Sequence, residues 1–209
     1  MKGICFTESM FNAVIEGRKI QTRRIINPQP DDDGLHDDDK FPRSLKSTLT
    51  GFNGTVNEIG ESKEFKPRYR VGDVVYLKEP YFITKGKPYY LYGKPEQKFM
   101  PDRYWKNKLF MPEKYARYFI EITDVRCERL RDISDEDCLK EGIKKDFDFD
   151  GIDVCYFNKI NHTKKINGFL DIAYKTPQEA YAYLIEKING KGTWNSNPFV
   201  WVYDFILKK

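Results

Sequence analysis

The chain contains only two histidines and four cysteines in 209 residues, and no two cysteines form a C-x-x-C pair. This scarcity argues against a zinc site or a disulfide framework, so we expect reduced thiols, no metal and no cofactor. No apolar run approaches the roughly 20 residues that cross a bilayer, and the N-terminus lacks a signal pattern. We therefore expect a cytoplasmic protein that makes no membrane contact. A phosphate loop, a Rossmann fingerprint and a nucleophile elbow are absent as well.

The composition is that of a folded protein, with 40% hydrophobic and 15% aromatic residues. This length and composition favour one domain over residues 1–209 rather than two. Residues 28–66 are rich in Asp, Gly, Ser and Asn, and residues 143–175 show no persistent apolar period, so we expect an insertion in each range. The net charge of +4 is mild, and its distribution is more informative than its total.

The apolar periodicity predicts an α+β fold. In residues 117–130 the apolar positions change phase after Ile122, which predicts a bulge or bend in a long strand. Turn signals and potential caps at Thr7, Ser134 and Thr176 mark helix starts. The predicted elements are helices over 7–17, 134–141 and 176–189 and strands over 21–26, 74–82, 117–130 and 199–207. This order favours a small β-barrel with flanking helices.

Residues 85–117 combine positive charge with aromatic rings. They hold nine Lys or Arg against three acids. Cations can neutralise phosphates while rings stack on unpaired bases, so we identify Trp105, Lys106, Lys108 and Arg117 as candidate ligand-binding residues. The alternative is a solvated loop that covers the core.

A resemblance to a known family begins at the end of the first predicted helix. Gly17-Arg18-Lys19-Ile20-Gln21-Thr22-Arg23-Arg24 resembles the G-x-K-x-x-T-x-R signature of ASCH domains, and Val71-Gly72-Asp73-Val74 is similar to their strand entry. The chain is most similar to phage and prophage ASCH proteins of uncertain function. That similarity extends through Phe110-Met111-Pro112, Glu121 to Val125, Arg131 to Ser134, Glu141-Gly142 and Asn197 to Val202.

The resemblance implies a PUA-like barrel with a cleft at the helix-to-strand corner. A small bacterial member of the family hydrolyses acylated cytidine with a lysine, a threonine and a glutamate. Carried over by motif, these are Lys19, Thr22 and Glu141. Arg23 and Arg24, in the same motif, become candidate ligand-binding residues, and Arg24, like Arg117, suits a phosphate or carboxylate because a guanidinium stays charged.

Catalysis by these residues has a chemical requirement. A threonine hydroxyl needs a neighbouring base, and a lysine is a base only when it is neutral. Desolvation and the cations Arg23 and Arg24 lower the pKa of Lys19, whereas Glu141 raises it. The structural alternative makes Lys19 an exposed cation at a helix end, Thr22 an ordinary strand residue and Glu141 a solvated helix residue.

Two functions of different classes follow, and binding comes first because it needs no neutral lysine. We expect a module that binds a nucleic acid or nucleotide, with RNA or a modified nucleoside as ligand and DNA as a further candidate. The alternative is an amidohydrolase acting on N4-acylated cytidine. A third hypothesis is a phage accessory protein that contacts another protein. The aromatic residues of the last strand, including Trp201, are assigned to the core.

Overall fold

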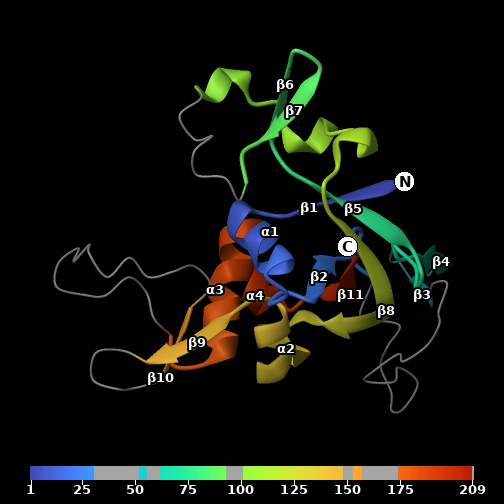
Figure 1. Cartoon of the computed structure of the whole chain (residues 1–209). Helices are drawn as coiled ribbons and strands as arrows, with labels where there is room; N and C mark the ends of the chain where they lie inside the picture. The colour runs from blue at the N-terminus through green and yellow to red at the C-terminus, as the bar shows by residue number, and fades with distance from the viewer. Residues whose placement is uncertain (31–51, 56–61, 93–100, 148–152, 157–173, 209) are drawn as a thin grey trace, which may run out of the picture.

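The computed structural model describes residues 1–30, 52–55, 62–92, 101–147, 153–156 and 174–208. Its centre is a five-stranded sheet in which β1 runs parallel to β5 and the other neighbours are antiparallel. Helices lie against this sheet (Figure 1), as expected for an α+β fold. In spatial order the strands are β1 (Lys2–Cys5), β5 (Val74–Lys78), β8 (Phe119–Arg129), β11 (Phe199–Lys208) and β2 (Gln21–Ile25).

The two longest strands, β8 and β11, pair along their length, and β8 is strongly curved (Figure 1). Asp204 pairs with Asp124 but Phe205 pairs with Ile122, so Thr123 of β8 has no partner on β11. One extra residue on one strand is a β-bulge, and it bends the strand that carries it. Ile122 and Val125, on either side of this bulge, are both buried. The predicted phase change in residues 117–130 is therefore confirmed.

The sheet does not close into a barrel over the described residues. Its edge strands are β1 and β2, and the sheet order contains no pairing between them. Two side chains donate to carbonyls here instead: Arg24 to Cys5, the last residue of β1, at 2.8 Å, and Lys108 to the next residue, Phe6, at 2.5 Å. We call this gap between β1 and β2 the seam.

Each of the three longer helices begins at a side-chain cap. The hydroxyls of Thr7, Ser134 and Thr176 accept backbone N–H groups of the first turn of each helix, as predicted. Gly17 and Gly142 follow the first two helices with φ of +74° and +103°. The helices are α1 (Glu8–Ile15), α2 (Asp135–Lys140) and α3 (Pro177–Asn189), and α3 packs against α2 and the short α4 (Thr193–Ser196).

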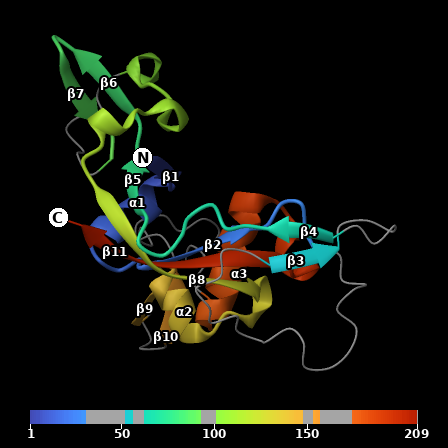
Figure 2. The ribbon, with the colours of Figure 1, turned by 90° about the vertical axis from the view of Figure 1, so that its right-hand side faces the viewer.

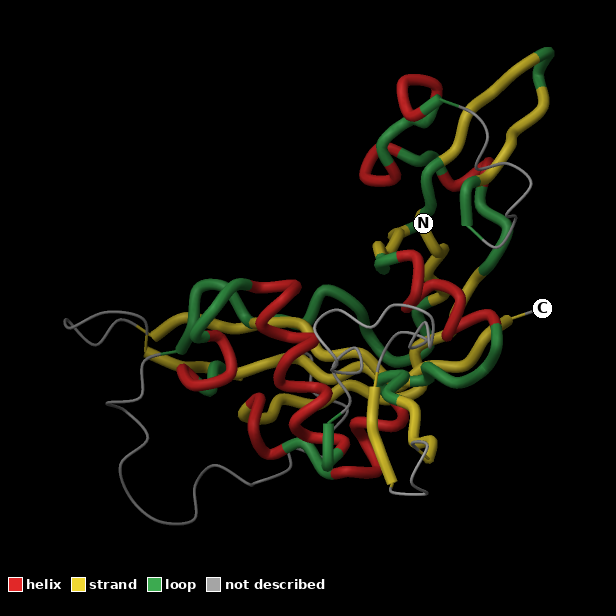
Figure 3. The backbone as a smooth tube through the Cα atoms, turned by 90° about the vertical axis from the view of Figure 1, so that its left-hand side faces the viewer, coloured by secondary structure: helices red, strands yellow, loops and turns green. Residues whose placement is uncertain are grey.

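Three hairpins of the described residues lie outside the central sheet. Two of them, one within residues 52–65 and one within residues 144–156, occupy parts of the ranges 28–66 and 143–175. We expected insertions in those ranges without assigning strands. The third, with three short 3₁₀ helices, forms an arm that projects from the rest of the fold (Figures 2 and 3). The hairpins are β3 (Phe52–Thr55) with β4 (Ser62–Phe65), β9 (Lys144–Phe147) with β10 (Asp153–Tyr156), and β6 (Tyr81–Thr84) with β7 (Lys87–Tyr90). The arm's 3₁₀ helices are Asp102–Tyr104, Lys108–Phe110 and Glu113–Tyr115, and a fourth, Leu130–Asp132, follows β8.

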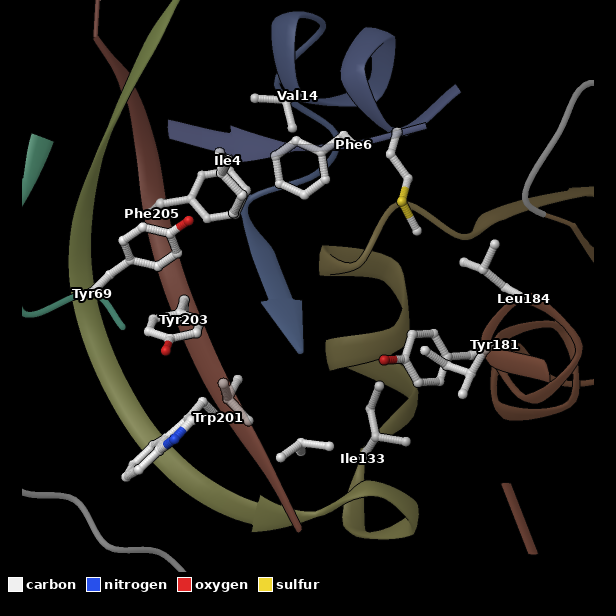
Figure 4. Packing of buried hydrophobic residues seen from close by; sticks show 14 of the residues in the cluster. Ile4, Phe6, Val14, Tyr69, Ile133, Tyr181, Leu184, Trp201, Tyr203 and Phe205 are labelled. Carbon is white, nitrogen blue, oxygen red and sulfur yellow. The ribbon is translucent and has the colours of Figure 1, made fainter. Parts of the chain in front are cut away.

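The hydrophobic core fills the space between the curved sheet and the helices. Phe205, Tyr203 and Trp201 follow one another along β11, and the Tyr69 ring lies beside Tyr203 (Figure 4). On the helical side, Tyr181 of α3 points its hydroxyl toward α2. The assignment of Trp201 to the core agrees with its 8% exposure. None of the described helices is both long and apolar enough to cross a membrane.

Candidate functional site

The motif Gly17 to Arg24 runs from the end of α1 into β2. Backbone bonds hold its first half: the N–H groups of Gly17, Arg18 and Lys19 donate to carbonyls of α1, and the Ile20 N–H donates to Lys140 of α2. The end of α2 therefore lies directly beside the motif. This contact brings Glu141, which caps the C-terminus of α2, next to Lys19 although 122 residues separate them in sequence.

Lys19 and Glu141 form an ion pair that is almost completely buried. The exposed fractions of the two side chains are 0% and 3%, and the Lys19 Nζ to Glu141 Oε2 distance is 2.5 Å. The same Nζ donates to the Gln21 and Glu141 carbonyls at 2.8 and 2.9 Å. An ammonium has three N–H donors, and three oxygens accept them here. In this arrangement Lys19 is a fully bonded cation, not the exposed helix-end cation of the structural alternative.

The charge state of Lys19 results from opposing effects. Burial lowers its pKa below the usual value, and the Glu141 carboxylate opposes this both as a charge and as a hydrogen-bond acceptor. Arg24 and Arg23 add smaller effects that lower the pKa. The directions agree with those expected from the sequence. Because all three bonds run to acceptors, the amine has no lone pair directed at a substrate until it loses a proton.

Thr22 and Glu141 line one cavity, which we call the motif cavity. It has a volume of about 230 Å³. The Thr22 hydroxyl makes no hydrogen bond to another described residue, so it is available to a ligand. Lys19 lies behind Glu141 and does not line the cavity. The other lining residues are Cys5, Phe6, Thr7, Met10, Arg23, Arg24, Ile25, Lys108, Tyr181, Ile185, Ile188 and Asn189.

Arg23 lines the motif cavity, but its charge is used within the protein. Its side chain is 0% exposed, and its guanidinium contacts Glu128 and Asp137 at 3.0 Å and Glu141 at 3.5 Å. It also donates to the Gln21 side chain. Although burial lowers the pKa of Arg23, these carboxylates raise it above the usual value overall. Arg23 therefore fixes the position of Glu141, which makes it a support of the cavity wall.

Arg24 and Lys108 are the cations of the motif cavity that pair with no carboxylate of a described residue. Arg24 donates to the Cys5 carbonyl and lies over the Phe6 ring at 5.4 Å. Lys108 donates to the Phe6 carbonyl and to the Tyr92 hydroxyl. Burial lowers the pKa of Lys108, and Arg24 contributes to this. An anion that enters the cavity would meet two cations whose charge is not yet neutralised.

A larger cavity, which we call the seam cavity, lies on the other side of Arg24. Its volume is about 630 Å³, and it shares Cys5, Arg24 and Ile25 with the motif cavity. Its other lining residues, none of which sequence reasoning proposed as a site residue, are Gly3, Ile4, Ile26, Asn27, Pro28, Phe65, Lys66, Arg68, Tyr69, Lys78, Leu109, Trp201 and Tyr203. One signal was available, since Phe65 to Arg70 combines two aromatic rings with three basic residues and no acid.

Trp105, Lys106 and Arg117 lie in the arm and line neither cavity. Trp105 packs edge-on against Phe82 with ring centroids 5.0 Å apart. Arg117 binds the buried Glu79 through two hydrogen bonds of 2.9 and 2.6 Å. Lys106 is exposed, and its backbone N–H donates to Tyr81. Of the predicted site residues, Thr22, Arg23, Arg24, Lys108 and Glu141 thus share one cavity, with Lys19 behind them.

No cluster of three or more His, Cys, Asp or Glu side chains that could hold a metal ion occurs within the described ranges. Comparisons of the chain with protein-family models, with curated proteins and with solved structures found no match.

Proposed function

We propose that this chain is a cytoplasmic ASCH-type protein of the PUA-like group that binds a nucleotide or a single-stranded nucleic acid, with RNA as first choice. The motif cavity is the proposed binding site. The open seam between β1 and β2 corresponds in this proposal to the place where a PUA-like barrel closes. The ligand occupies the motif cavity at that seam.

The observation that carries the proposal is the position of Arg24. Its guanidinium lies between two cavities, donates to one backbone carbonyl and pairs with no carboxylate of a described residue. Unpaired guanidinium groups in a concave site favour phosphate, which accepts two parallel hydrogen bonds. The Thr22 hydroxyl and the Glu141 carboxylate add polar groups that can contact a base or sugar.

A binding screen with nucleosides, modified nucleosides and short oligoribonucleotides tests this proposal. Affinity for the oligonucleotides should fall steeply as salt rises, because phosphate binding releases counterions. Lys108→Met, which removes a charge from the motif cavity, should reduce the salt slope by about 1. Lys144→Met removes a charge from β9, which lines neither cavity, and serves as control. Absence of binding to every ligand, or a slope unaffected by Lys108→Met, would count against the proposal.

A second candidate function is hydrolysis of an N4-acylated cytidine. The buried Lys19–Glu141 pair behind a cavity that exposes Thr22 favours it. The Thr22 oxygen would attack the amide carbonyl, the amine of cytidine would leave with a proton, and water would then hydrolyse the acyl ester on Thr22. The Thr22 proton needs an acceptor. Lys19 can accept it only after losing one of its own protons. The Glu141 carboxylate, whose Oε2 lies 2.5 Å from Lys19 Nζ, is the base nearest to that amine.

Thr22→Val separates the two functions. Valine keeps the branched shape of threonine but removes the hydroxyl. An enzyme would lose nearly all turnover of N4-acetylcytidine, while a binding protein would keep most of its affinity. Lys19→Arg keeps the charge but cannot act as a neutral base, so it should also lose turnover; because Lys19 is fully buried, an unchanged melting temperature is required before the loss is assigned to chemistry. If the wild type shows no turnover of any acylated nucleoside, the catalytic roles of Lys19, Thr22 and Glu141 are excluded and binding remains.

A further inference from the structure

The seam cavity has the size and composition of a ligand site in its own right. Its volume of about 630 Å³ falls within the range of small-molecule pockets, roughly 300–1,000 Å³. Six parts of the chain form it: β1, the end of β2 with the following residues, the segment from Phe65 to Tyr69, Lys78 of β5, Leu109 of the arm, and β11 with Trp201 and Tyr203. The motif cavity, at about 230 Å³, is much smaller.

Cations surround the seam cavity without any acid. Four cations line it, including Arg24, Arg68 and Lys78, and no Asp or Glu is among its described lining residues. Arg24 and Lys78 each donate to one backbone carbonyl, at 2.8 Å in both cases. The guanidinium of Arg68 makes no hydrogen bond to a described residue and lies over the Tyr69 ring at 5.6 Å. These three side chains keep most of their donors for an anion.

Aromatic rings form the apolar wall of the same cavity. Tyr69, Trp201 and Tyr203 line it, and Tyr69 and Tyr203 meet edge-to-face with centroids 5.3 Å apart (Figure 4). Their hydroxyls already have partners, since Tyr69 donates to the Gly3 carbonyl and Tyr203 accepts from the Arg68 N–H. Burial raises the pKa of Tyr203 to about 12, so this ring is neutral. The three residues are only 1–8% exposed, so they offer the cavity a narrow apolar surface, which suits an uncharged base or sugar.

We propose that the seam cavity binds a nucleotide, with its phosphate on Arg24, Arg68 and Lys78 and its base or sugar against the aromatic wall. This inference rests on the proposed function and deepens it. Arg24 lines both cavities, so a phosphate bound to its guanidinium would lie at the boundary between the two sites. The ligand of the protein is therefore a phosphorylated nucleotide, free or within a strand, and a free nucleoside is a poor ligand.

The test compares ligands that differ by one chemical part. Affinities are measured by calorimetry for inorganic phosphate, the four ribonucleosides, their 5′-monophosphates and single-stranded tetranucleotides. The monophosphates should bind at least about tenfold more tightly than the nucleosides, because hydrogen bonds to charged groups are strong. They should also bind more tightly than inorganic phosphate, which lacks the part that contacts the rings. Tetranucleotides that bind more tightly than monophosphates would identify a strand as the source of the nucleotide, and equal affinities would identify the free nucleotide.

Arg68→Gln and Lys78→Met locate the binding in this cavity. Both side chains reach solvent or the cavity and neither belongs to the apolar core, so the variants should fold. Each should remove about tenfold or more of the preference for monophosphate over nucleoside. Arg131→Gln, an exposed cation that lines neither cavity, is the matched control.

The outcomes separate the two proposals. If nucleotides bind but Arg68→Gln and Lys78→Met behave like Arg131→Gln, the seam-cavity inference is overturned while the proposed function stands. The same holds if inorganic phosphate binds as tightly as the monophosphates, because the site is then a simple anion site. If no nucleoside, nucleotide or oligonucleotide binds, both proposals are overturned together.

Discussion

The substitution Glu141→Gln tests the buried pair on which the site is built. Glutamine has nearly the shape of glutamate but no charge, so Lys19 keeps its two carbonyl acceptors and loses the carboxylate at 2.5 Å. Arg23 loses a contact of 3.5 Å at the same time. The variant therefore leaves an ammonium in a site where its side chain is 0% exposed.

The loss of folding free energy in Glu141→Gln can be estimated in two independent ways. Removal of one partner from a buried ion pair costs about 3–5 kcal/mol. Alternatively Lys19 loses its proton, which from an ordinary pKa of 10.5 costs about 4.8 kcal/mol at pH 7 at 1.36 kcal/mol per pH unit. The smaller of the two costs applies, so we expect Glu141→Gln to lower the free energy of unfolding by about 3–5 kcal/mol. Urea denaturation at pH 7 measures this directly.

The loss of stability caused by Glu141→Gln should become smaller as the pH rises. Burial lowers the pKa of Lys19 in the folded protein, so between that pKa and 10.5 the unfolded chain binds more protons than the folded one. Stability then rises with pH in this window. Without Glu141 the pKa falls further and the window widens. The stability deficit of Glu141→Gln should therefore shrink to about 1–2 kcal/mol near pH 9.5.

Glu121→Gln is the matched control, because Glu121 also pairs with a lysine, Lys208, at 2.5 Å. Those side chains are 31% and 49% exposed, so the pair should contribute only about 0.2–1 kcal/mol. If Glu141→Gln costs no more than Glu121→Gln, or if its deficit grows with pH, the interpretation of Lys19 as a buried ammonium held by Glu141 is wrong.

Three further predictions concern the stability of the fold. Ser134→Ala removes the N-cap of α2 and should lower stability by about 1 kcal/mol in a denaturant titration, with Ser134→Thr as the neutral control. Arg117→Gln leaves the fully buried Glu79 unpaired and should cost about 3–5 kcal/mol at pH 7; burial raises the pKa of Glu79, so the deficit should shrink as pH falls, and a pH-independent deficit would contradict this. Gly3→Ala places a methyl group 2.6 Å from the Tyr76 ring and should lower stability by about 1–3 kcal/mol by thermal unfolding, whereas an unchanged melting temperature would show that the ring can move.

Local features of the fold were predictable because local chemistry determines them. Thr7, Ser134 and Thr176 cap their helices as their side chains predict. The phase change after Ile122 located the bulge to within one residue, because a bulge reverses which alternate positions are buried. The open edge of the sheet was not predictable from periodicity. Whether β1 and β2 pair depends on the curvature of strands that lie far from both in sequence.

The candidate site shows the same division. The motif placed Thr22, Arg24 and Lys19 together, since they are neighbours in sequence. Residues 85–117 were harder to interpret. A basic and aromatic composition is typical both of a nucleic-acid-binding surface and of a segment whose rings pack on one another. Most rings of the arm pack on one another, as Phe82 does with both Tyr89 and Trp105. Among the described residues of this region, Lys108 alone lines the motif cavity.

The seam explains why basic side chains gather at one place in a protein of modest net charge. An unpaired strand edge presents backbone carbonyls that need donors; Arg24 supplies one at Cys5 of β1, and Lys108 supplies one at Phe6, just beyond the strand. A β-ladder would have satisfied the same carbonyls with uncharged N–H groups. Side-chain cations satisfy them while keeping unused donors and a net positive charge at the gap. Arg24 contacts this edge through its side chain and lines both cavities, so its remaining donors face the two places where the proposed anionic ligand binds.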